Sequence, residues 1–153
     1  MSTHASTSTR NLVAPSSRNR IQESSVNTLK SVSELAGRIL LSAIFLISGL
    51  GKIGAYAGTA AYMSSLGVPA ALLPAVVATE VLGAVAIIVG WQTRVTAFLL
   101  AGFTLLTGLV FHSHFADPMQ SIMFLKNVAI AGGFLLLVAS GAGPLSVDRR
   151  YSK

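Results

Sequence analysis

Residues 70–90 read AALLPAVVATEVLGAVAIIVG, and this stretch decides the fold class. It is apolar almost throughout and has the roughly 20 residues that a helix needs to cross a bilayer. It shows no sustained alternation of polar and apolar residues, so a β-strand is a poor alternative. One carboxylate, Glu80, lies near its centre. A charge at the centre of a membrane costs about 2.5–3.5 kcal/mol on insertion scales, so a partner for Glu80 is expected elsewhere in the chain.

Three further apolar segments have a similar length. Together the four predict an all-α fold, an up-down bundle of four membrane-spanning helices. The expected spans are residues 36–55, 71–90, 95–112 and 121–140. Charged residues make up only 10% of the chain, against about 25% in soluble domains, which also favours a membrane protein. Residues 34–148 are expected to form the four-helix domain, followed by a basic C-terminus at residues 149–153.

The N-terminal residues 1–33 are rich in Ser and Thr and hold no apolar run that could form the core of a signal peptide. A disordered cytoplasmic tail is the favoured interpretation. A short amphipathic helix over residues 26–36, lying on the membrane surface, is the alternative, because apolar residues recur there at helical spacing.

Apart from Lys52 and Lys126, which lie within the spans, lysine and arginine lie on one side of the predicted bundle. They precede the first span, occupy the short turn at residues 91–94 and follow the fourth span, whereas the longer links at residues 56–70 and 112–120 contain none. The positive-inside rule therefore places both termini in the cytoplasm and predicts a multi-pass protein of the inner (plasma) membrane. This distribution also accounts for the net charge of +6, and no basic-aromatic pattern points to nucleic acid.

The chain contains no cysteine. Disulfides, iron–sulfur clusters and thiolate metal sites within this chain are therefore excluded. His112 and His114 are too few to predict a metal site, so none is expected.

Four polar side chains are expected to approach one another inside the bundle. At 1.5 Å per residue from the cytoplasmic ends, Glu80 lies at about 15 Å, Lys52 and Lys126 at about 21 Å and His112 at about 27 Å. Small residues on the same faces, such as Gly83 beside Glu80, favour an inward orientation. We therefore expect Glu80 to pair with Lys52, Lys126 or both.

The purpose of this pairing stays open at this point. The pair has a function, or it only fixes how the helices pack. Two lysines against one carboxylate also mean that one lysine is neutral or that the site accepts an anion.

An ordered set of short motifs over residues 35–148 resembles the DoxX family of small four-helix membrane proteins. The motifs are Gly37-Arg38, Ser48-Gly49 with Lys52, Leu66-Gly67-Val68-Pro69, Glu80 with Gly83, Gly90, Thr93-Arg94, Phe111-His112, Phe124-Leu125-Lys126-Asn127, Gly132-Gly133 and the run from Gly141 to Asp148. The resemblance implies a subunit of a quinone-linked oxidoreductase system, in sulfur-compound or oxidative-stress redox chemistry.

The same resemblance suggests roles for individual residues. Glu80, Lys52, Lys126 and His112 would be catalytic, and Lys52, Lys126 and Asn127 would contact a quinone or an anion. Lysine would stabilise the quinone oxygens as they gain negative charge, while Glu80 or His112 would relay protons. Electrons would come from a partner subunit, a bound flavin or the substrate.

Two other classes of function stay open. In the first, the chain would be a transport component for a small anion or a hydrophobic solute. It would then act as a homo-oligomer, because four helices leave little lumen. Alternatively, it is a non-catalytic membrane anchor that recruits a soluble redox partner through its cytoplasmic tails.

Overall fold

The computed structural model describes residues 17–151 of the 153-residue chain. The described part consists of helices and their connections, without strands. The elements are α1 (Ser17–Gly54), α2 (Tyr56–Ser65), the 3-10 helix η1 (Ala70–Leu72), α3 (Leu73–Val89), α4 (Thr93–Phe111), α5 (Pro118–Ser140) and α6 (Val147–Tyr151). Long, sufficiently apolar segments occur in α1, η1–α3, α4 and α5, which confirms the predicted all-α fold with four spans.

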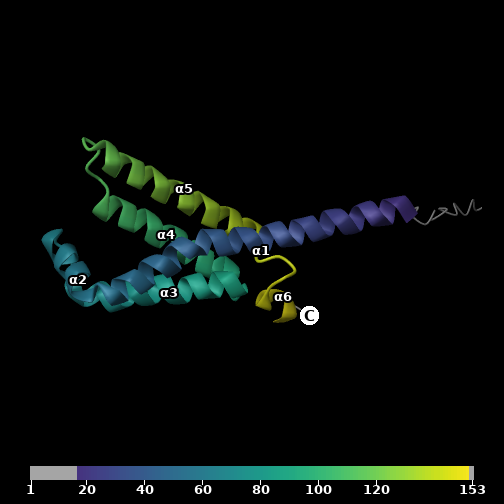
Figure 1. Cartoon of the computed structure of the whole chain (residues 1–153), viewed down its shortest axis with the longest axis horizontal. Coiled ribbons are helices and arrows are strands. Elements are labelled where there is room, and N and C mark those ends of the chain that lie inside the picture. Colours follow the sequence, from purple (N-terminus) through teal and green to yellow (C-terminus); the bar gives the residue numbers. More distant parts are fainter. Residues whose placement is uncertain (1–16, 152–153) are drawn as a thin grey trace, which may run out of the picture.

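The four spanning helices form two packed pairs. α1 packs along α3, and α4 packs along α5, while α3 also contacts α4 (Figure 1). Figure 1 shows the two pairs spreading apart toward the end of the bundle that carries α2. The core lies where all four meet, and there the rings of Phe45 and Phe134 are edge to face, with centroids 5.4 Å apart. The outside of the bundle exposes many large apolar side chains, as a lipid-facing surface requires.

Glycines set the closest approaches between these helices. A β-carbon at Gly49 would lie 2.7 Å from Val81 Cγ2, so α1 and α3 are in contact there. A β-carbon at Gly108 would lie 3.0 Å from Asn127 Cβ, so α4 and α5 are in contact there as well. Small residues allow helix backbones to approach in a membrane, where van der Waals packing is a main source of association.

The N-terminal region differs from the expected tail at residues 1–33. α1 begins at Ser17, so residues 17–33 form one continuous helix with the first span. The physical reason is that a span already supplies the helix nucleus, and residues 17–36 contain no Gly or Pro that would stop its propagation. Hydroxyls are also accommodated, because Thr28 and Ser31 donate to the carbonyls four residues earlier. Residues 1–16, the rest of the expected tail, lie outside the described residues.

Two other segments hold more structure than expected. The link at residues 56–70, predicted without an element of its own, contains α2 and η1. The C-terminal segment folds back under the bundle and includes α6, which begins before the predicted boundary at residue 149.

An aspartate in this C-terminal segment caps α4. The Asp148 carboxylate accepts hydrogen bonds from the backbone N–H groups of Gln92 (2.7 Å) and Thr93 (2.9 Å), and the Asp148 N–H donates to the Gly90 carbonyl (2.8 Å). Burial alone would raise the pKa of Asp148, but these hydrogen bonds and the charge of Arg38 lower it below its ordinary value. Asp148 therefore acts as an N-cap of α4 from a distant position in the sequence: its carboxylate accepts hydrogen bonds from backbone N–H groups at the start of the helix.

Arg38 joins the same C-terminal segment to the first span. Its side chain is buried, with the whole residue 1% exposed. The guanidinium donates to the carbonyl oxygens of Leu145 and Ile87 and lies in the field of Glu34 and Asp148. Arg38 thus connects α1 to α3 and to the C-terminal segment.

The orientation of the bundle is a prediction that the distribution of Lys and Arg motivates. We expect reporter fusions placed after Tyr62 and after Lys153 to report opposite sides of the membrane, with Lys153 in the cytoplasm. Alkaline phosphatase and green fluorescent protein activities of each fusion would measure this. If both fusions report the same side, the four-span topology is wrong.

Candidate functional site

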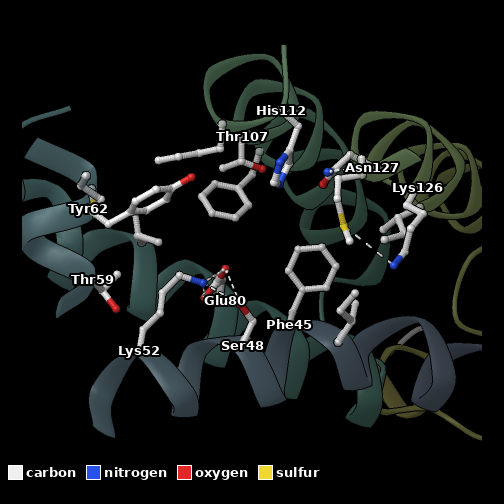
Figure 2. Close-up of a pocket in the computed structure, with 17 residues that line it drawn as sticks. Phe45, Ser48, Lys52, Thr59, Tyr62, Glu80, Thr107, His112, Lys126 and Asn127 are labelled. Carbon is white, nitrogen blue, oxygen red and sulfur yellow. Dashed lines mark hydrogen bonds and ion pairs between the residues drawn. The ribbon is translucent and has the colours of Figure 1, made fainter. Parts of the chain in front are cut away.

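A cavity of about 300 Å³ lies between the two helix pairs, in the half of the bundle that carries α2. Much of its wall is apolar or aromatic. The apolar and aromatic lining residues include Phe45, Met63, Val76, Phe103 and Phe111. Figure 2 shows polar side chains on two sides of this space. Such a combination of an apolar wall and a few polar groups is typical of small-molecule sites.

Glu80 pairs with Lys52 on one side of the cavity. Lys52 Nζ lies 2.8 Å from each carboxylate oxygen and 2.5 Å from Ser48 Oγ. The Ser48 hydroxyl in turn donates to Glu80 Oε1 at 3.3 Å. The Glu80 side chain is 7% exposed and the Lys52 side chain 25%, so the pair is shielded from its surroundings. We call these three residues the Ser48–Lys52–Glu80 cluster.

The positions of these residues in their helices explain the cluster. Ser48 and Lys52 are one turn apart on α1 and therefore share a face, while Glu80 comes from α3. Gly49, which follows Ser48 on α1, lets α3 approach closely, since a β-carbon there would lie 3.2 Å from Glu80 Cβ. Gly83, expected beside Glu80, instead makes room for Leu100 of α4, because a β-carbon there would lie 2.9 Å from Leu100 Cδ2.

Lys126 lies across the cavity and does not contact Glu80. It projects from α5, and its Nζ has Met123 Sδ, 4.0 Å away, as its neighbour (Figure 2). Among residues 17–151, the ion pairs join Lys52 to Glu80 and Lys30 to Glu34, and none involves Lys126. Of the two partners expected for Glu80, the structure therefore selects Lys52.

His112 and Asn127 line the same side of the cavity as Lys126. His112 follows the last residue of α4, and its Nδ1 lies 2.8 Å from Gln120 Oε1. With the amide oxygen as acceptor, Nδ1 carries a proton, and in the neutral imidazole Nε2 is then an acceptor. Asn127 donates one amide hydrogen to the Met123 carbonyl (2.9 Å), which leaves its second amide hydrogen for a ligand.

The chemistry open to the cluster follows from its hydrogen bonds. Lys52 Nζ has three acceptors within 2.8 Å, two on Glu80 and one on Ser48. An ammonium in this arrangement donates and cannot take the proton of Ser48, so a serine nucleophile activated by lysine is not supported. A carboxylate paired with an ammonium can instead exchange a proton with a ligand or stabilise a developing charge.

Comparison with known proteins gives the family. The family model DoxX matches residues 33–113. The chain belongs to the DoxX family. It is 50% identical over 125 residues to Inner membrane protein YqjF of Escherichia coli (strain K12), across 82% of this chain and 96% of that protein. It is 42% identical over 123 residues to Inner membrane protein YphA of the same strain, across 76% of this chain and 88% of that protein. No solved structure matches the chain.

These relatives establish where this DoxX protein resides. Both are named as inner membrane proteins, and the four apolar helices fit a multi-pass protein of that membrane, surrounded by the lipid bilayer. The family match includes Lys52, Glu80 and His112, whereas Lys126 and Asn127 lie beyond it.

Sequence reasoning missed the contribution of α2 to this DoxX cavity. Thr59, Tyr62 and Met63 line it from α2, and the ring of Tyr62 stacks on that of Phe111 with centroids 5.9 Å apart. Residues 59, 62 and 63 share one helical face, which is the signal that could have found them. A link read as irregular chain gives no such face, so these residues were not predicted.

Proposed function

We propose that this DoxX protein is the quinone-binding membrane subunit of an oxidoreductase system. The observation that carries the proposal is the cavity of about 300 Å³ between membrane-spanning helices, with aromatic walls and polar groups on two opposite sides. Quinones dissolve in the bilayer, and their rings carry two carbonyl oxygens at opposite positions. A ring in this cavity would have the Ser48–Lys52–Glu80 cluster on one side and His112, Asn127 and Lys126 on the other.

The polar groups match what quinone reduction requires. Reduction of a quinone to a quinol adds two electrons and two protons, one proton to each oxygen. Glu80 and His112 are the groups able to exchange protons, and Lys52 and Lys126 stabilise negative charge on the oxygens. The chain has no cysteine and thus no ligands for an iron–sulfur cluster, so we assign the electrons to a flavin or another redox cofactor on a partner subunit.

Binding of menadione, a small quinone, tests this proposal. Purified protein in a neutral maltoside detergent is expected to bind menadione saturably, with one site per chain, as measured by titration calorimetry. Val76→Phe fills part of the cavity and should weaken binding about tenfold or more, which corresponds to 1.4 kcal/mol. Leu82→Phe is the matched control, because Leu82 is on the same helix but 68% exposed on the outer surface.

Two results would contradict quinone binding in this cavity. One is the absence of saturable menadione binding by folded wild-type protein. The other is equal weakening by Val76→Phe and Leu82→Phe, which would place the quinone on the lipid-facing surface.

A further inference from the structure

The cavity contains one more cationic side chain than carboxylates. Its charged lining residues, apart from His112, are Lys52, Lys126 and Glu80. Lys52 and Glu80 neutralise each other at 2.8 Å, and the three acceptors of Lys52 Nζ all belong to the Ser48–Lys52–Glu80 cluster. The surplus charge therefore belongs to Lys126.

Lys126 has no anionic partner among residues 17–151. The neighbour of its Nζ is Met123 Sδ, at 4.0 Å, and a thioether sulfur is only a weak acceptor. Lys126 lies eight residues after Pro118, the first residue of α5, and therefore about 12 Å from the N-terminal end of that helix. A cation at that depth in hydrocarbon is costly unless an anion or a water-filled space accompanies it.

The residue that follows Lys126 in the sequence supplies a second donor to the cavity. Asn127 is the next residue of α5 and also lines the cavity, and one of its amide hydrogens is free of protein partners. An ammonium and an amide N–H are both suited to a negatively charged oxygen, and hydrogen bonds to such an oxygen are stronger than neutral ones. The opposite wall is not suited to a negatively charged oxygen, because the carboxylate of Glu80 lies there and would repel it.

We infer that the cavity prefers ring ligands that carry an ionised hydroxyl, with that oxygen placed between Lys126 and Asn127. This rests on the proposed function, since it names the class of quinone that the same cavity takes. Acidic hydroxyquinones belong to this class: their hydroxyl is conjugated with a ring carbonyl and is ionised at neutral pH. A neutral quinone of the same size lacks the charge that Lys126 would stabilise.

Lawsone, a hydroxynaphthoquinone, and its O-methyl ether are the probes for this inference. The two share one ring system, but only lawsone is ionised at neutral pH. In a neutral maltoside detergent without phospholipid, wild-type protein is expected to bind lawsone about ten times more tightly than the ether, which is 1.4 kcal/mol. Lys126→Met should remove this preference, because it should weaken lawsone binding about ten times more than ether binding. Lys126→Arg should keep the preference.

The control variant is Lys30→Met. Lys30 pairs with Glu34 in the N-terminal part of α1, outside the cavity, and its side chain is 71% exposed. Lys30→Met removes one positive charge from the same chain at a position that does not contact the ligand. It should therefore leave the affinities for lawsone and for the ether unchanged. Binding of the ether by every variant shows that the cavity is folded.

The outcomes separate this inference from the proposed function. Equal binding of lawsone and the ether, or a preference that survives Lys126→Met, overturns the inference and leaves quinone binding standing. Failure of both probes to bind folded protein overturns the proposed function. If phosphatidylglycerol raises the thermal stability of the wild type but not of Lys126→Met, and lawsone does not compete with it, the partner of Lys126 is a lipid phosphate and the inference is wrong.

Discussion

Glu80→Gln is expected to lower the free energy of unfolding in detergent by about 3–5 kcal/mol, the usual cost of removing one partner from a buried ion pair. The reason is that the substitution leaves the ammonium of Lys52 without the carboxylate that lies 2.8 Å away. Thermal unfolding followed by loss of helical circular dichroism would measure the change. Glu80→Gln that is as stable as the wild type would show that the pair contributes nothing to folding.

Two double variants identify the partner of Glu80. Glu80→Gln with Lys52→Met removes both charges and should recover most of the lost stability, because no uncompensated charge is left. Glu80→Gln with Lys126→Met is the matched control and should recover none, since Lys126 Nζ neighbours Met123 Sδ and no carboxylate. Recovery in the second double but not in the first would mean that Glu80 pairs with Lys126.

The first of these doubles also separates a structural from a functional pair. If Lys52 and Glu80 only fix helix packing, the double variant should fold and bind menadione as the wild type does. The proposed function predicts that the double folds but shows altered quinone chemistry, because the proton donor and the charge on that side of the ring are gone. Reconstitution with the native membrane fraction and measurement of quinone reduction would show the difference.

Arg38→Met is expected to have the second large effect, also about 3–5 kcal/mol in unfolding free energy, because it removes a buried cation from the field of two carboxylates. Without the guanidinium, Asp148 loses a nearby cation, Glu34 keeps only Lys30 of its two, and the Leu145 carbonyl loses its donor. The C-terminal segment should then detach from the bundle. Thermal unfolding and limited proteolysis between Gly141 and Tyr151 would measure both consequences.

An exposed arginine of the same helix provides the control for Arg38. Arg20 lies on α1 with an exposed side chain, so Arg20→Met should change stability by no more than about 0.5 kcal/mol. Arg38→Lys retains the charge but not the forked geometry that reaches two carbonyls, and an intermediate loss is expected. Protease resistance of the C-terminal segment in Arg38→Met would contradict the role assigned to Arg38.

The sequence by itself determined the architecture of this protein. Four apolar runs of spanning length leave helices as the solution, because each backbone polar group in lipid must find its partner within the segment. The same reasoning predicted that Glu80 needs a cation, since a lone charge at the membrane centre is costly. Depth along a helix is a local quantity, at 1.5 Å per residue, so Lys52 and Lys126 could both be placed near Glu80.

Only the tertiary structure decided between these two lysines. Counted from Arg38 and from Ser140, the predicted cytoplasmic ends of the two spans, both lysines lie 14 residues along, so their expected depths are equal. The choice therefore depends on which helix packs against α3. Gly49 brings α1 against α3 and so brings Lys52 to Glu80, while α5 packs on α4 and leaves Lys126 across the cavity. The Arg38 contact with Leu145 spans 107 residues of sequence and depends on the folded-back chain end. Which side chains meet depends on which helices are neighbours in the bundle. Periodicity and depth along a single helix do not specify those neighbours.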